Sequence, residues 1–177
     1  FAYASLPVLT DGDHELEARV DDEAGNPAAA TQAVHVDTGV PGALIAAPLD
    51  GAVLADADDA RPGLPGFQIE VSFGSPSLDA SSWQVQLAAN CDATFTTCDA
   101  PARIAQGAIT VPGGLEPSLF PTLPAAATPY YKVIVVVSDG VGNLGSATAN
   151  VTVNLLECQV GLSGIGTGTF INNQSCP

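Results

Sequence analysis

Two segments of the chain share one alternation of apolar and polar residues, 117 positions apart. Residues 14–36 read HELEARVDDEAGNPAAATQAVHV, and residues 131–153 read YKVIVVVSDGVGNLGSATANVTV. Side chains along a strand point alternately to opposite faces, so each segment predicts a strand, a D-x-x-G-N turn and a second strand. A fixed period of this size predicts tandem copies of one module.

The stretch between the copies contains further short alternating runs. The clearest is 67–73, and the next is 83–87; in both, apolar residues occupy the odd-numbered positions. Weaker runs cover 43–47, 104–111 and 115–120. The 18 Gly and 14 Pro of the chain suit short strands joined by turns. Strands of this length and spacing predict an all-β protein with an antiparallel β-sandwich.

The copies also predict where modules begin and end. After the first copy, residues 36–41 read VDTGVP, and Gly and Pro end a strand and stiffen the step to the next module. We therefore expect the C-terminal strands of one module in residues 1–38, a complete module in 39–154, and the N-terminal strands of a following module in 155–177.

The first copy carries a recognisable motif. Residues 9–26 read LTDGDHELEARVDDEAGN, and residues 34–41 read VHVDTGVP. This pattern resembles bacterial immunoglobulin-like repeats of large exported surface proteins, adhesins and stalk-like arrays. The resemblance covers residues 9–41 and, in weaker form, 130–153, after which Asn154-Leu155 replaces the Asp-Thr pair.

The resemblance implies an immunoglobulin-like antiparallel β-sandwich in tandem modules. Within such a module, Trp83 would be the core tryptophan of the third strand. Tyr131, or its neighbour Tyr130, would lie near the start of the sixth strand, where a tyrosine corner forms. The resemblance also implies a structural function as a surface stalk, fibre or spacer.

The charge of the chain narrows the choice of partners. It has 19 acidic and 4 basic residues, for a net charge of -15. Nucleic acids and anionic membranes are themselves negative, so this charge opposes binding to either. No apolar stretch approaches the ~20 residues that a membrane-spanning helix needs. We expect no nucleic acid partner and no membrane insertion.

Four cysteines indicate the compartment. Four cysteines allow three connectivities, and proximity favours Cys91–Cys98 and Cys158–Cys176. Neither spacing is C-x-x-C and no His lies near, which argues against a zinc or redox site. Two local disulfides predict an oxidising compartment, and hence an extracellular or cell-surface protein.

The sequence offers little for catalysis. Its two histidines, His14 and His35, both fall on predicted strands of the partial first module, and no G-x-S-x-G element is present. No pair among the 19 carboxylates is singled out for acid–base work. We expect a protein that is not an enzyme.

Calcium is the best chemical hypothesis. Five aspartates supply clustered oxygen ligands of the kind that calcium prefers: Asp11, Asp13, Asp22, Asp56 and Asp58. None of these clusters matches the EF-hand loop, and turns favour Asp without any ion. Both interpretations remain open at this stage.

Two functions from different classes are therefore expected. The first is a structural segment of an exported repeat protein, whose partners are neighbouring modules of the same or identical chains. Its partial modules could combine head to tail by strand complementation, which would build a homopolymeric filament. The alternative is an adhesin-type module that recognises carbohydrate or protein through its loops.

Overall fold

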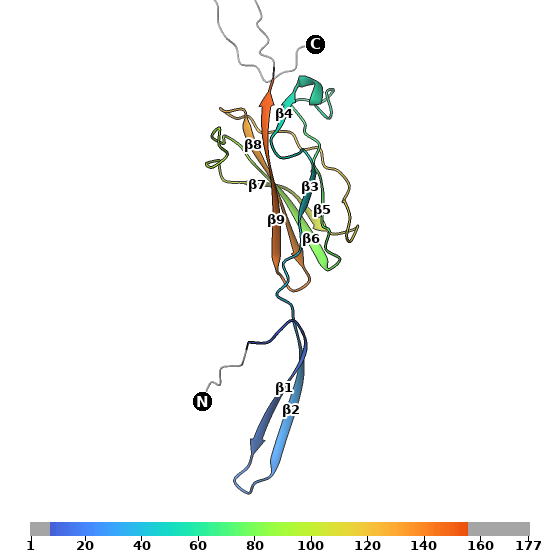
Figure 1. Cartoon of the computed structure of the whole chain (residues 1–177), viewed down its shortest axis with the longest axis vertical. Coiled ribbons are helices and arrows are strands. Elements are labelled where there is room, and N and C mark those ends of the chain that lie inside the picture. Colours follow the sequence, from blue (N-terminus) through green and yellow to red (C-terminus); the bar gives the residue numbers. More distant parts are fainter. Residues whose placement is uncertain (1–7, 156–177) are drawn as a thin grey trace, which may run out of the picture. The chain divides into compact units, whose positions relative to one another are not determined.

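The computed structural model describes residues 8–155, which form two units that meet between Val40 and Pro41 (Figure 1). The boundary lies two residues beyond the one expected from the sequence. Unit 1 precedes it and unit 2 follows it. The described residues form nine β-strands and one short 3-10 turn, and they contain no α-helix. In the same residues, no helix has the length and apolar character needed to cross a membrane. The expected module start at 155–177 falls almost entirely outside the described part.

Unit 1 is a hairpin of two ten-residue strands, β1 (Gly12–Asp21) and β2 (Pro27–Val36). The strands are antiparallel, in continuous register from Gly12↔Val36 to Asp21↔Pro27. This register places Leu16, Val20, Val34 and Val36 on one face of the hairpin, as the two-residue alternation of the sequence predicts. The hairpin predicted for the first copy is therefore present.

Unit 2 contains a two-stranded and a five-stranded sheet in a sandwich-like arrangement (Figure 1). The small sheet pairs β3 (Leu44–Ala47) with β5 (Ser72–Gly74). The large sheet has the order β4-β9-β8-β6-β7. Its strands are β4 (Ala52–Ala55), β6 (Ala80–Ala88), β7 (Ala102–Ala108), β8 (Tyr130–Asp139) and β9 (Leu144–Asn154). Only β4 and β9 run parallel in this sheet; its other pairs are antiparallel.

The core lies between the two sheets of unit 2. Odd-numbered residues of β8 and β9, and residues 83, 85 and 87 of β6, point into it and meet the apolar residues of 67–73. Fully or nearly fully buried members are Phe67, Ile69, Val71, Phe73, Val85, Leu87, Val133, Val135, Val137, Val151 and Val153. Burial of one face explains why β6, β8 and β9 alternate so clearly in the sequence.

The segment 67–73 is less regular than its alternation predicts. Only Ser72–Gly74 forms a ladder, and isolated bridges join the rest of the segment to residues 115–122. Two features explain this. Pro117 and Pro121 lack the N–H that a continuous ladder needs. The side chain of Gln68, which alternation would expose, is buried and donates to Pro65 O and to Thr122 Oγ1.

The aromatic residues singled out from the sequence lie in unit 2. Trp83 is half-buried, and its ring meets that of Phe73 edge-to-face with centroids 4.7 Å apart. Its indole Nε1 donates to Ala108 O at 2.9 Å. Tyr131 is buried, and its hydroxyl donates to Pro124 O at 3.1 Å. The Trp83 ring is thus held by its contact with Phe73 and by one hydrogen bond to the backbone. The Tyr131 ring is held by burial and by one hydrogen bond to the backbone.

Candidate functional sites

The D-x-x-G-N turns of the two copies are built alike. In unit 1, Asp22 Oδ1 accepts from Ala24 N at 2.9 Å and from Asn26 N at 2.8 Å, and Asp22 Oδ2 accepts from Asn26 Nδ2 at 2.7 Å. Gly25 has a φ of 82°, which an L side chain disfavours. The side-chain hydrogen bond from Asn26 is the main cause that lowers the pKa of Asp22. The motif residues therefore have a structural role in shaping the turn.

Unit 2 contains the same turn, and here the aspartate of the motif is buried. Asp139 is 4% exposed, and its Oδ1 accepts from the backbone N–H groups of Val141, Gly142 and Asn143 at 2.7–2.9 Å. Asn143 Nδ2 donates to Asp139 Oδ2 at 2.7 Å. Burial raises the pKa of Asp139, but the hydrogen bonds from Asn143, Val141 and Gly142 outweigh it, so the pKa lies below its ordinary value.

Asp139 has a second carboxylate beside it. Ala80 pairs with Asp139 across β6 and β8, which brings the preceding Asp79 close, and carboxylate oxygens of Asp79 and Asp139 lie within 4.8 Å of each other. Asp79 is exposed. Two adjacent carboxylates form a candidate cation position, since oxygen ligands suit calcium. The sequence analysis missed this pair. The repeat equates Asp139 with the predicted ligand Asp22, but no local pattern points to Asp79.

The predicted calcium ligands of unit 1 take part in hairpin contacts. Asp11 Oδ1 accepts from Thr38 N at 2.9 Å and from Thr38 Oγ1 at 2.8 Å. Asp13 Oδ1 lies 2.7 Å from His35 Nδ1, and this hydrogen bond raises the pKa of His35. Asp22 forms the turn described above. Each of the three carboxylates thus has protein donors.

The predicted ligands of unit 2, Asp56 and Asp58, belong to the 3-10 turn η1 (Asp56–Asp58), where Asp58 Oδ2 accepts from Ala55 N at 2.8 Å. Within residues 8–155, the five predicted aspartates enter no group of three or more His, Cys, Asp or Glu side chains with ligand atoms within 4.8 Å. Calcium at these five positions stays a prediction.

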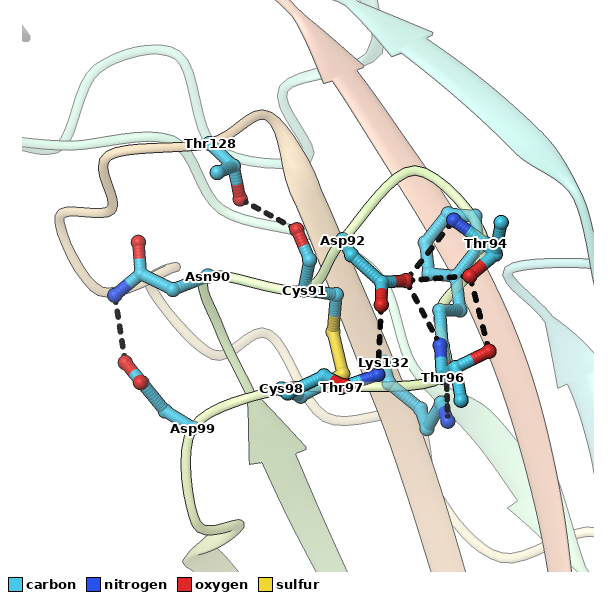
Figure 2. Close-up of a disulfide and its surroundings, with 11 residues drawn as sticks. Asn90, Cys91, Asp92, Thr94, Thr96, Thr97, Cys98, Asp99, Thr128 and Lys132 are labelled. Carbon is cyan, nitrogen blue, oxygen red and sulfur yellow. Dashed lines mark hydrogen bonds between the residues drawn. A yellow bond between two sulfur atoms is a disulfide. The ribbon is translucent and has the colours of Figure 1, made fainter.

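A disulfide closes the loop between β6 and β7. Cys91 and Cys98 are bonded (Figure 2). Inside the loop, Asp92 accepts from Thr94 N, Thr94 Oγ1, Thr96 N and Thr97 N at 2.8–3.1 Å. The side-chain hydrogen bond from Thr94, with those backbone donors, lowers the pKa of Asp92 to about 2. The other predicted pair, Cys158 and Cys176, lies outside the described residues.

The loop is attached to strand β8. Lys132 Nζ donates to Phe95 O at 2.7 Å, and the ring of Phe95 meets that of Tyr130 with centroids 5.5 Å apart. Phe95 has a φ of 55°, in the left-handed region that is unusual for a residue with a side chain. The disulfide and these two contacts together hold the loop in this conformation.

Replacement of both Cys91 and Cys98 by Ser should lower the free energy of unfolding of unit 2 by about 2 kcal/mol, because the bond closes a short loop in the unfolded chain. Urea unfolding followed by Trp83 fluorescence measures this change. Wild-type protein treated with reductant should show the same loss. A variant as stable as the oxidised wild type would contradict a stabilising role for the bond.

Acid should lower the free energy of unfolding of unit 2, because Asp92 becomes protonated. A carboxylate whose folded-state pKa lies below its unfolded value of about 4 stabilises the fold above that pH and loses this contribution as the pH falls through the folded value. For Asp92 that value is about 2. The urea midpoint should therefore fall between about pH 4 and about pH 2, and Asp92→Asn should flatten that fall. An equal pH dependence of variant and wild type would argue against this role.

The outer face of the large sheet differs from the rest of this acidic chain in its charge. Even-numbered residues of β8 and β9, and residues 82, 84 and 86 of β6, point away from the core, and none of them is acidic. A shallow hollow of about 360 Å³ on unit 2 is lined by Ser82, Trp83, Gln84, Gln106, Gly107, Val136, Ser138 and Leu144. The residues that line the hollow carry hydroxyl, amide, aliphatic and indole groups, and none of them has a formal charge.

Comparisons with known proteins assign no family to the chain. No protein-family model and no curated protein matches the chain. Among solved structures, the chain is similar to a Ca2+-stabilized adhesin that helps an Antarctic bacterium reach out and bind ice. The TM-score is 0.34 at 19% sequence identity, over 83% of this chain and 33% of the adhesin chain. The chain therefore spans about a third of that structure, and the likeness assigns no family.

Proposed function

We propose that this chain is a non-enzymatic structural segment of an exported protein built from tandem immunoglobulin-like modules, in which it serves as stalk, fibre or spacer. The observation that supports this most is the repeated hairpin. His14 pairs with Val34 in unit 1, and Tyr131 pairs with Val151 in unit 2, at the same offset of 117 residues. The two D-x-x-G-N turns share their hydrogen bonds as well.

Three features of unit 2 support an immunoglobulin-like module. Strand β4 runs parallel to β9 at one edge of a five-stranded sheet, while a smaller sheet covers the opposite side of the core. The hydroxyl of Tyr131, near the start of β8, bonds to the backbone of Pro124 a few residues upstream, as in a tyrosine corner. Trp83 on β6 packs on Phe73 of the small sheet.

The contacts of the His and Cys side chains in the described residues support a structural rather than a catalytic function. His14 contacts Thr10 O, and His35 pairs with Asp13, so both imidazoles take part in contacts of unit 1. Cys91 and Cys98 are bonded to each other. The disulfide supports an oxidising, extracellular location.

Calcium would stabilise such a module if it bound the carboxylate pair Asp79–Asp139. A ligand that binds only the folded state stabilises it by RT ln(1 + [L]/Kd), and so raises the melting temperature as its free concentration rises above Kd. Calcium at millimolar concentration should then raise the melting temperature of the wild type above its value in EDTA, and Asp79→Asn should abolish the rise. A rise that persists in Asp79→Asn would place calcium elsewhere.

The proposed function is tested on the native producer. Antibodies raised against unit 2 should label extended structures on the cell surface in electron microscopy, and the labelled polypeptide should contain further modules with the same 117-residue hairpin spacing. Labelling confined to the cytoplasm, or a labelled protein with no second sandwich module, would contradict the proposal.

An adhesin function is the second candidate, supported by the uncharged hollow on the outer face. Its hydroxyl and amide groups could pair with sugar hydroxyls, and its volume of about 360 Å³ is of the size of small-molecule sites. Glycan-array binding that is lost in Gln84→Ala but retained in Gln68→Asn, a change in the buried interior, would support this function. A glycan array without any binding signal would contradict the carbohydrate-binding function.

A further inference from the structure

Strand β7 contains a register shift that changes the direction of one side chain. Val85 of β6 pairs with Ala105. The next residue of β6, Gln86, pairs with Arg103, so Ile104 is the extra residue of a β-bulge. Directly paired residues of antiparallel strands share a face, and Gln86 points away from the core, so Arg103 lies on the outer face. Strict alternation from Ala105 would have turned residue 103 towards the core.

The guanidinium of Arg103 lies beside the hollow on this face. Its Nη1 donates to Gln106 Oε1 at 2.7 Å, and Gln106 lines the hollow. Gln106 pairs across the strands with Gln84, a second lining residue. An arginine has five N–H donors in a planar fork, and the bond to Gln106 uses one of them. Because Arg103 is exposed, a ligand in the hollow can reach its guanidinium at the rim.

The charge of Arg103 is not balanced by a carboxylate of the protein. The ion pairs found in residues 8–155 are Arg19–Glu17 and His35–Asp13, both in unit 1. Arg103 therefore forms no ion pair within the described residues, although the chain has 19 acidic and 4 basic residues. The outer-face residues of β6, β8 and β9 are not acidic either. Since guanidinium and carboxylate groups match in geometry as well as in charge, a ligand carboxylate suits this position.

The groups inside the hollow favour a saccharide over a peptide. The hydroxyls of Ser82 and Ser138 lie 2.6 Å apart, and hydroxyls both donate and accept, as sugar hydroxyls do. Val136 and Leu144, which is 65% exposed, offer apolar surface to the C–H groups of a sugar ring. A peptide commonly binds a sheet by adding a strand at an edge. Strands β6 and β8 have a neighbour on each side, so the hollow offers no such edge.

We propose that the hollow binds a saccharide that carries a carboxylate, and that Arg103 binds this carboxylate. The inference rests on the adhesin function, the second candidate above, and names the class of its ligand. The net charge of -15 repels polyanions at long range, so the ligand is a sugar with an isolated carboxylate rather than a densely charged chain.

Two matched ligands test the proposal on the full chain. The first is a disaccharide that contains one glucuronic acid, and the second is its methyl ester, which lacks the negative charge. NMR titration gives the Kd of each. We expect the acid to bind about tenfold more tightly than the ester, as for a charge-assisted hydrogen bond. Arg103→Gln should reduce the affinity for the acid to that for the ester. An unchanged Kd for the ester shows that the hollow is intact in this variant.

Two further variants separate the charge of Arg103 from its position and its geometry. Arg61 is the other arginine of unit 2, and its guanidinium lies over the Phe120 ring rather than at the hollow. Arg61→Gln should therefore keep the full preference for the acid. Arg103→Lys retains the charge without the planar fork, so it should keep part of the preference. Circular dichroism checks that each variant is folded.

The outcomes separate this inference from the function on which it rests. A preference for the acid that is lost in Arg103→Gln and kept in Arg61→Gln supports the proposal. Equal binding of acid and ester by the wild type overturns it but leaves an adhesin for neutral sugars. A preference that persists in Arg103→Gln also overturns it, and so does equally tight binding of a tripeptide with a central glutamate. If neither sugar binds at millimolar concentration, the proposal fails, and the glycan array decides on the adhesin function itself.

Discussion

Phe73→Ala should lower the free energy of unfolding of unit 2 by about 3–5 kcal/mol, the usual cost of removing a buried phenylalanine ring. Phe73 is fully buried at the centre of the core, and its ring packs edge-to-face on Trp83. The substitution removes this contact and leaves a cavity between the two sheets, which the surrounding valines can fill only in part. Urea unfolding followed by circular dichroism gives the change without depending on the altered environment of Trp83.

Phe120→Ala is the matched control for this prediction. Phe120 is 36% exposed, and the guanidinium of Arg61 lies over its ring, 4.5 Å from the centroid. A partly exposed cation–π contact contributes about 1 kcal/mol, so this variant should unfold close to the wild-type midpoint. Equal losses in the two variants would mean that the core is not centred on Phe73.

The β8–β9 hairpin of unit 2 could be predicted from sequence because one of its faces is buried in the core and the other is not. In β8, Val133, Val135 and Val137 are buried, whereas Ile134 and Val136 are only half-buried. Alternation and the repeat together therefore indicated these two strands and the residues of the turn between them. The coarse class, all-β with sandwich-like sheets, followed from the same signal.

Irregular pairing could not be predicted in this way. Residues 67–73 show clear alternation, yet most of the segment forms isolated bridges with 115–122. The reason is non-local. The partner segment contains Pro117 and Pro121, and the amide of Gln68 is buried against Thr122. Alternation reports which face is apolar, but it does not report which N–H groups the partner can offer.

The carboxylate pair Asp79–Asp139 was missed for a related reason. Sequence reasoning favoured aspartates that cluster along the chain, such as Asp56 and Asp58, because clustered ligands are visible in one dimension. Asp79 reaches Asp139 only through the pairing of β6 with β8. Local clusters in this chain instead shape turns, as Asp22 and Asp58 do with backbone N–H groups.

Gly74→Ala should cost about 3 kcal/mol, because it introduces an atom where two backbone segments already touch. A Cβ on Gly74 would lie 2.0 Å from Gly114 O and 2.8 Å from Leu115 Cα. These are main-chain atoms, so no rotamer change can relieve the overlap. Strand β5 and the 114–116 segment must therefore separate. The separation weakens the hydrogen bonds from Ser75 N to Gly114 O and from Glu116 N to Phe73 O.

Two other glycines make this prediction selective. A Cβ on Gly107 would lie 2.8 Å from the Trp83 ring, a side chain that can shift, so Gly107→Ala should cost less than Gly74→Ala. A Cβ on Gly140 meets nothing within 4 Å, and Gly140→Ala should leave the urea midpoint near that of the wild type. The expected order of unfolding free energies is therefore Gly140→Ala above Gly107→Ala above Gly74→Ala. If Gly74→Ala unfolds together with Gly140→Ala, β5 and the 114–116 segment do not approach each other as closely as described, and the sandwich is open along that side.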